Sequence, residues 1–307
     1  MKKKVLFLVG PTASAKSEVA LALAQKLKGE IISCDAMQLY RGMDIGTAKP
    51  TFAEKRKVPH HLLDLVSPRS EFSVFKHRQF ALETMDQIFK RKKTPIFIGG
   101  SGLYIKAIID GLAPQPGKQT EARKKFEALA KKESVSHLYE RLKAMDPKRA
   151  RAIHPNDKKR IIRALEILEA SGKSQADWEL ETKGLKSLGI QYVLFGLLWD
   201  RKKLYDRIER RVDQMIQQGW VREVKHLKRI GFSKTSKSAI GYHELSAHLR
   251  GDCSLLEATN AVKKRTRNLA KKQMTWFKRD KRIRWILVSK DSDLKGAIKL
   301  MIQEFTK

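Results

Sequence analysis

The feature that most constrains the fold is a strand–loop–helix pattern near the start of the chain. The apolar run VLFLV (5–9) is followed by GPTASAKS (10–17) and by the helical pattern SEVALALAQKLK (17–28). Main-chain N–H groups at a helix N-terminus bind anions, and the helix dipole favours negative charge there. Only Ala15, in the place of the second glycine, departs from the phosphate-binding pattern G-x-x-x-x-G-K-[ST]. We therefore predict a phosphate site at residues 10–17, and we expect Ala15 to be tolerated if its φ angle is negative.

Further short apolar runs alternate with helical patterns along the chain. We expect strands at 5–9, 30–35, 60–66, 94–100, 191–200 and 282–289, and helices at 17–28, 72–92, 201–218 and 255–278. Alternation of this kind predicts parallel βαβ units with helices on both faces of one sheet. The predicted fold class is α/β: a P-loop-type parallel sheet core flanked by helices, with a helical insertion domain.

The insertion begins near a change in composition. The stretch GLAPQPGKQT (111–120) is rich in Pro and Gly, which marks a boundary. Residues 121–180 are helical and charged, without a strand pattern. We therefore place the core at residues 1–112 and 185–307, with basic C-terminal helices, and the insertion domain at 113–184.

The charge of the chain indicates a polyanionic partner. The sequence holds 65 Lys and Arg against 33 Asp and Glu, a net charge of +32, and such side chains displace counterions from phosphate backbones. The basic segments 147–163 and 262–282 are candidate RNA contacts, although each alone also fits a solvated helix face. Within the second segment Trp276 fits either a core position or a surface on which an unpaired base stacks, and we expect the core.

The cysteines and the apolar runs indicate the compartment. Cys34 and Cys253 lie far apart and form neither a disulfide framework nor a zinc motif, which fits a reducing compartment. No apolar stretch approaches membrane-spanning length, and the glycine loop interrupts the one apolar run that resembles a signal peptide. We expect a soluble, cytoplasmic protein without a membrane partner.

Asp35 is the first candidate for catalysis. It ends the predicted strand 30–35, and ligands of an open parallel sheet collect at the carboxyl ends of the strands. A carboxylate there can ligate Mg²⁺ or accept a proton, and it also fits a helix cap or turn. The loop does not name the reaction, so a small-molecule kinase and other enzymes that hold a diphosphate remain open.

Seven segments, in order, then carry a resemblance over nearly the whole chain. They are GPTASAKS, SCDAMQLYRGMDIGTAKP, PHHLLD, GGSGLYIKAIIDGL, HPNDKKRIIRALE, AIGYHEL and TRNLAKKQMTWFKR. Together they closely resemble the bacterial tRNA dimethylallyltransferase (tRNA isopentenyltransferase) family. The resemblance implies transfer of a dimethylallyl group from dimethylallyl diphosphate to N6 of adenosine 37 of tRNA, beside the anticodon, with release of diphosphate.

The resemblance also implies roles for individual residues. Asp35 matches the general base, while Thr12 and Arg211 match residues that stabilise the leaving diphosphate. The diphosphate-binding positions are Gly10, Pro11, Thr12, Ala13, Ser14, Ala15, Lys16 and Ser17, and the expected cofactor is Mg²⁺, with Ser17 as its ligand. The tRNA-binding positions are Asp35, Ala36, Met37, Gln38, Ser101, Arg123, Lys159, Arg160, Ile161, Ile162 and Arg163.

The implied partners are the anticodon stem-loop of tRNA and dimethylallyl diphosphate, and we expect a monomer. Three alternatives remain open: a P-loop small-molecule kinase, a prenyltransferase acting on free adenine nucleotides, and an RNA-binding protein without activity. The first two leave the basic segments without a role.

Overall fold

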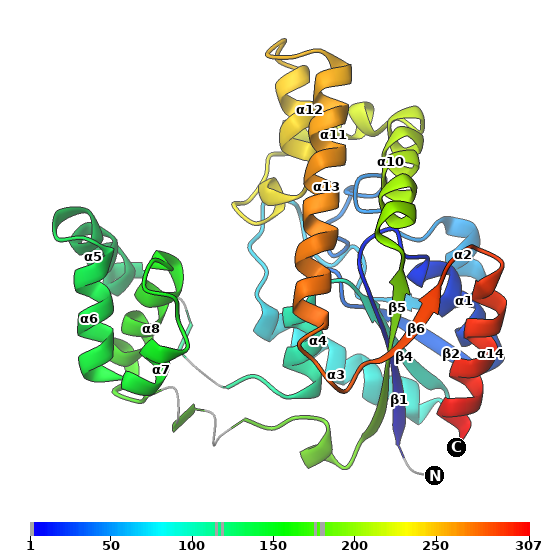
Figure 1. The fold of residues 1–307 in the computed structure, drawn as a ribbon, viewed down its shortest axis with the longest axis horizontal. Coiled ribbons are helices and arrows are strands. Elements are labelled where there is room, and N and C mark those ends of the chain that lie inside the picture. Colours follow the sequence, from blue (N-terminus) through cyan, green and yellow to red (C-terminus); the bar gives the residue numbers. More distant parts are fainter. Residues whose placement is uncertain (1–2, 114–115, 118–119, 175–176, 179–181) are drawn as a thin grey trace. The chain divides into compact units, whose positions relative to one another are not determined.

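The computed structural model describes residues 3–113, 116–117, 120–174, 177–178 and 182–307 (Figure 1). Contacts divide the chain into two compact units, Met1–Ile109 with Leu185–Lys307, and Asp110–Gly184. The sequence analysis predicted that the insertion begins after residue 112 and ends at residue 184. Among the described residues, no helix is both long enough and apolar enough to cross a bilayer.

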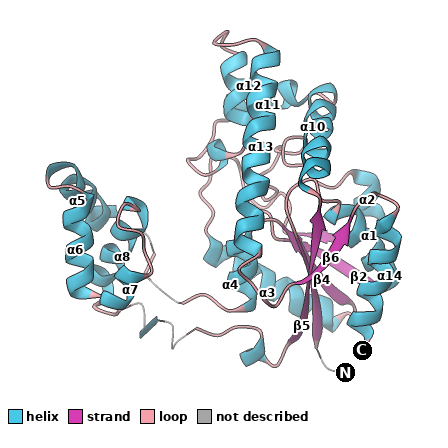
Figure 2. Cartoon of the chain, in the orientation of Figure 1, coloured by secondary structure: helices cyan, strands magenta, loops and turns pink. Residues whose placement is uncertain are grey.

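The larger unit is built on a six-stranded sheet in which every strand is parallel to its neighbours (Figure 2). The strand order is β3-β2-β4-β1-β5-β6. The strands are β1 Lys4–Val9, β2 Gly29–Ser33, β3 His60–His61, β4 Thr94–Gly99, β5 Gln191–Trp199 and β6 Arg284–Val288. This confirms the predicted α/β fold class with a parallel sheet.

The helices of this unit cover both faces of the sheet. They are α1 Lys16–Lys26, α2 Phe52–Lys57, α3 Val74–Lys90, α4 Gly102–Ile109, α10 Arg201–Gln217, α11 Trp220–Ile230, α12 Tyr242–His248, α13 Leu255–Phe277 and α14 Asp293–Thr306. Short 3₁₀ helices span Lys186–Leu188 and Ser236–Ser238. Alternate residues of β1 enter opposite cores: Phe7 belongs to the core that includes side chains of α3, α4 and α11, and Leu8 belongs to the core that includes side chains of α1, α10 and α14.

One predicted strand is much shorter than expected. The pattern at 60–66 predicted a full strand, but β3 holds only His60 and His61, and Val66 makes a single bridge to Tyr40. Leu62 and Asp64 adopt φ angles of 61° and 56°. Extended backbone needs negative φ, so these two residues end the strand.

The smaller unit is helical in its described part. It contains α5 Thr120–Lys132, α6 Val135–Met145, α7 Pro147–Arg151 and α8 Lys158–Ser171. Phe126, Leu138, Leu142 and Leu165 are among the side chains that form its own apolar core.

The strand order brings the expected functional segments together. Strands β2, β4, β1 and β5 are consecutive in the sheet and run in one direction, so their carboxyl ends meet at one edge. Asp35 follows β2, Ser101 follows β4, and residues 10–15 follow β1. Gly99 makes this approach possible, since a Cβ atom there would lie 2.3 Å from the carbonyl oxygen of Cys34.

Candidate active site

The phosphate loop, residues 10–15, connects β1 to the first turn of α1 in a conformation that is unusual for its residues. Ala13 and Ala15 have φ angles of 62° and 64°. A negative φ was the condition under which we expected Ala15 to be tolerated, and the structure does not meet that condition. Left-handed backbone costs a non-glycine residue about 1–2 kcal/mol, so surrounding contacts must hold the loop in place.

Four side chains supply those contacts, one for each of four successive loop residues. Lys16 Nζ donates to Pro11 O at 2.5 Å, Gln273 Oε1 accepts from Thr12 N at 2.9 Å, Arg207 Nε donates to Ala13 O at 2.9 Å, and Trp199 Nε1 donates to Ser14 O at 3.1 Å. Three carbonyl oxygens of the loop are thus bonded to the protein. Among the described residues, the main-chain N–H groups of residues 13–17 donate no hydrogen bond to the protein, which leaves them free to donate to an anion.

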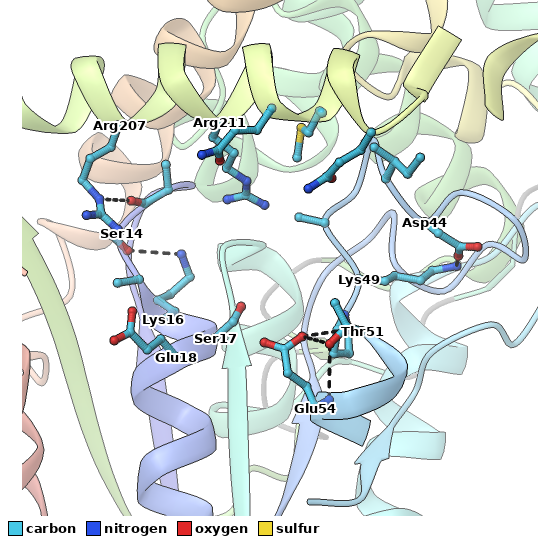
Figure 3. A pocket seen from close by; sticks show the side chains of 18 of the residues that line it. Ser14, Lys16, Ser17, Glu18, Asp44, Lys49, Thr51, Glu54, Arg207 and Arg211 are labelled. Atoms are coloured by element: carbon cyan, nitrogen blue, oxygen red, sulfur yellow. Dashed lines mark hydrogen bonds and ion pairs between the residues drawn. The ribbon is translucent and has the colours of Figure 1, made fainter. Parts of the chain in front are cut away.

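Two cations face this loop. The pKa of Lys16 is lowered to about 7, mainly by burial and also by the nearby charge of Arg211, while the charge of Asp35 opposes the shift. Burial also lowers the pKa of Arg211, again opposed by Asp35. Figure 3 shows Lys16 and Ser17 at the start of α1, across the cavity from Arg207 and Arg211 on α10. Because both cations lack full solvation, an anion bound between them would be stabilised strongly.

Three cavities that share lining residues surround these side chains. The largest, about 910 Å³, is lined by residues 13–18, by the loop around Lys49 and by Arg211 (Figure 3). Two smaller cavities, of about 100 and 120 Å³, share Thr12, Asp35, Thr47, Arg211 and Gln273 as lining residues. Arg211 lines all three, so one guanidinium faces both the phosphate loop and Asp35.

Asp35 lies where the sequence placed it, at the carboxyl end of β2. Its Oδ1 accepts a hydrogen bond from Met37 N at 2.8 Å, which fixes the turn after the strand. The adjacent Cys34 N donates to Ile98 O at 2.7 Å and joins this end of β2 to β4. One carboxylate oxygen of Asp35 therefore stabilises the turn, and the side chain also lines the two smaller cavities.

The neighbouring tRNA-binding candidates are tied to the same framework. Ser101 Oγ accepts from Ala36 N at 3.2 Å, so Ser101 lies beside the turn that carries Asp35. Met37 lines one of the smaller cavities. The Gln38 amide donates to the carbonyl oxygens of Thr47 and Ala48 at 3.2 and 3.1 Å, which supports the loop that forms one wall of the cavities.

The candidates in the insertion unit divide into two groups. Arg123 and Arg163 both pair with Glu166, whose side chain is fully buried, at 2.6 and 2.9 Å. Ile161 and Ile162 are buried in the core of the unit. Their side chains point into that core because α8 is amphipathic and turns its apolar face inward. Lys159 and Arg160 are exposed.

Sequence reasoning missed Gln273, Arg207 and Trp199, which hold the phosphate loop. Gln273 lies within a basic segment that we interpreted through its charged and aromatic residues. It shares one face of α13 with Thr266 and Leu269, and all three line a cavity. A search for a lone amide at helical spacing from apolar residues could have found it.

Trp276 corrects another expectation. It is 40% exposed, whereas the adjacent Phe277 is 3% exposed and belongs to the core. The expectation that Trp276 is a core residue was therefore wrong, because the two residues lie on different sides of α13.

The residues present fit a magnesium ion held mainly by a substrate. Within the described residues, no group of three or more His, Cys, Asp or Glu side chains could hold a metal. Ser17 is exposed at the start of α1 and lines two of the cavities. Mg²⁺ commonly takes one or two protein ligands together with phosphate oxygens and water, and a loop hydroxyl suits that arrangement.

Comparison with known proteins places this geometry in context. The model of the IPP transferase family matches residues 38–280. The chain is 43% identical over 287 residues to "tRNA dimethylallyltransferase 2" of Geotalea uraniireducens, covering 93% of this chain and 92% of that protein.

Two solved structures resemble the whole chain. A full-length tRNA isopentenylpyrophosphate transferase from Bacillus halodurans has a TM-score of 0.72 and 37% identity, covering 100% of this chain and 97% of its own. A eukaryotic dimethylallyltransferase, described as acting on tRNA, has a TM-score of 0.79 and 25% identity, covering 97% of this chain and 78% of its own.

Proposed function

The chain belongs to the IPP transferase family, and from that premise we propose how its site transfers a dimethylallyl group to an adenosine of tRNA. The donor is dimethylallyl diphosphate. The acceptor is N6 of adenosine 37, beside the anticodon, and diphosphate is released. No observation favours a kinase or an enzyme for free adenine nucleotides.

One observation carries the proposal: an anion-binding loop and a carboxylate face adjoining cavities, with Arg211 lining all of them. A displacement on an allylic diphosphate needs these groups at its two ends. The diphosphate end requires hydrogen-bond donors and positive charge, and the adenine end requires a proton acceptor.

The reaction breaks the bond between the allylic carbon and the bridging oxygen, and forms a bond from that carbon to N6. Negative charge grows on the diphosphate as the bond breaks. The N–H groups of residues 13–17, together with Lys16 and Arg211, stabilise that charge more in the transition state than in the bound substrate. Thr12 lies at the junction, where it lines both smaller cavities.

The proton on N6 passes to Asp35. An exocyclic amine of adenine is a weak nucleophile, so alignment by the rigid ends of β1, β2 and β4 matters as much as basicity. The target base must leave its stack to reach the cavity, as in other enzymes that modify bases.

Ser17, whose side chain lines two of the cavities, would hold Mg²⁺. When bound, the ion supplies positive charge that offsets the charge of the diphosphate. Gly10, Pro11, Ala13, Ser14 and Ala15 contribute through their backbone.

The RNA side uses exposed positive charge. Lys159 and Arg160 of the insertion are exposed, as are Lys264, Lys271 and Lys272 of α13. These side chains are suited to phosphate contacts with the anticodon stem-loop. Ala36, Met37, Gln38 and Ser101 form the part of the sheet edge nearest Asp35. We expect a cytoplasmic monomer, because its substrate is tRNA.

The test is incubation of the protein with Mg²⁺, dimethylallyl diphosphate labelled in the allyl group, and unmodified tRNA. We expect label on N6 of the adenosine beside the anticodon and none on free AMP. Label on AMP alone, or phosphoryl transfer from ATP without allyl transfer, would overturn the proposal. Inorganic diphosphate should inhibit the reaction by competing with the donor.

A further inference from the structure

We propose that Trp276 is a stacking platform for an unpaired RNA base that neighbours the everted adenosine. The inference rests on the proposed function for its RNA partner and adds a recognition residue to it. Trp276 lines none of the cavities described above, and it is much more exposed than the Phe that follows it.

The first step is the position of Trp276 on its helix. Thr266, Leu269 and Gln273 line the cavity that Asp35 faces. With 3.6 residues per turn, Trp276 continues the same face of α13. It lies one turn beyond Gln273, about 4.5 Å along the axis at 1.5 Å per residue. This is close to the spacing between neighbouring nucleotides, so a base next to one held in the cavity can reach it.

The second step is the surface against which the indole lies. A Cβ atom built on Gly102 would lie 2.2 Å from indole Cδ1 and Nε1. The ring therefore packs directly on the backbone of Gly102, at the start of α4, and this contact is possible only for glycine. Gly102 follows Ser101, whose hydroxyl accepts from the main chain beside Asp35. The indole is thus fixed next to the turn that carries the general base.

The third step is the charge around the ring. Lys272 precedes Trp276 by one turn, and Lys278 and Arg279 follow it; all three are exposed. The described residues provide no acidic partner for these cations. An exposed aromatic ring among unpaired cations is complementary to single-stranded RNA, in which bases stack and phosphates carry charge. An apolar protein partner would not use the surrounding charge.

The experiment measures binding and turnover of an anticodon stem-loop RNA by wild type, Trp276→Leu and Trp276→Phe. Stacking of a base on an aromatic ring contributes enough that Trp276→Leu should weaken RNA binding about tenfold. Trp276→Phe keeps a flat ring and should recover most of the loss. Leu256→Ala, on the same helix but far from the cavity, removes another exposed apolar side chain and should bind as wild type.

A second arm changes the RNA instead. Two stem-loops are compared, one with an abasic residue before the target adenosine and one with an abasic residue after it. We expect one of the two to bind wild type about tenfold more weakly than the intact RNA does. The same RNA should lose no further affinity with Trp276→Leu, since the partner of the base is already gone. The proposal would be overturned if the abasic RNA and Trp276→Leu each reduced the affinity and their effects multiplied when combined. It would also be overturned if Trp276→Leu bound the intact RNA with wild-type affinity.

The two proposals fail differently. If wild type binds the stem-loop but transfers no allyl group, the proposed function is wrong while the stacking result stands. If transfer occurs and Trp276→Leu is indistinguishable from wild type, only the stacking proposal is wrong. Thermal unfolding of each variant shows whether the fold is intact, and Trp276→Phe decides the outcome if the leucine variant unfolds.

Discussion

Gln273 Oε1 accepts a hydrogen bond from the main-chain N–H of Thr12 at 2.9 Å, although the two residues lie at opposite ends of the sequence. The same amide donates from Nε2 to Gly100 O at 3.1 Å. One side chain of α13 thereby joins the phosphate loop after β1 to the segment after β4. The loop that would hold the diphosphate and the turn beside Ser101 are therefore positioned by a common contact.

Replacing Gln273 tests this bridge. Gln273→Met keeps the size of the side chain and removes both hydrogen bonds, so we expect kcat to fall about 10- to 100-fold through misalignment. RNA affinity should change little. Gln273→Glu keeps the acceptor for Thr12 but places a carboxylate against Gly100 O, and it should be worse than the methionine variant. Single-turnover allyl transfer measures both, and a kcat near that of wild type in Gln273→Met would mean that the bridge is dispensable.

Asp35 is tested by Asp35→Ala and Asp35→Asn. Loss of a general base typically costs 10²- to 10⁴-fold in rate, and we expect about that loss in both variants. Binding of the anticodon stem-loop should persist. Since Asn can still accept the hydrogen bond from Met37 N, it separates loss of the base from loss of the turn. Substantial turnover by Asp35→Asn would argue against proton transfer to this residue.

Arg211→Ala should slow allyl transfer about 10²-fold or more, because the variant removes a preorganised positive charge from the leaving group. Arg211→Lys restores the charge without the planar fork and should recover only part of the rate. RNA binding is the control and should be nearly unchanged. A rate within twofold of wild type for Arg211→Ala would remove Arg211 from the mechanism.

Ala15→Gly relieves a left-handed φ of 64°. We expect the free energy of unfolding to rise by roughly 0.5–1 kcal/mol, with allyl transfer unchanged or faster. The matched control is Ala261→Gly, at an exposed position within α13, which should lower stability by about 1 kcal/mol. Urea unfolding measures the free energy of unfolding of both variants. If both substitutions lowered it, glycine at residue 15 would not relieve backbone strain.

The pH dependence of diphosphate binding tests Lys16. Its pKa in the free enzyme is lowered to about 7, so Lys16 is charged below that pH and increasingly neutral above it. An anion favours the charged form and raises the pKa, so binding above pH 7 takes up a proton. The affinity for metal-free inorganic diphosphate should therefore fall as pH rises from 7 to 9.

Calorimetry in wild type and Lys16→Met measures that effect. Dividing the affinity of wild type by that of Lys16→Met at each pH cancels the effect of the titration of diphosphate itself. This ratio should decrease with pH above 7, by up to about tenfold per pH unit. A constant ratio between pH 6 and pH 9 would show that the ammonium of Lys16 does not titrate in this range.

The sequence by itself determined the features that depend on local patterns. The apolar runs at 5–9, 94–100 and 191–200 became neighbouring parallel strands, and Lys16 began a helix, because periodicity and the glycine loop act over a few residues. The position of Asp35 also followed, since the end of a parallel strand lies at the ligand-binding edge. Those inferences needed no knowledge of which distant segments touch.

Only the tertiary structure decided which side chains meet. It brought Gln273 to Thr12, paired Arg123 with the buried Glu166, left Trp276 exposed against Gly102 and held Ala15 at a positive φ angle. A run of basic residues has the same composition whether its members face RNA, an internal carboxylate or a cavity. The physical reason is that hydrogen bonds, burial and backbone strain depend on packing between segments far apart in the chain, and such packing is fixed only when the sheet order brings those segments together.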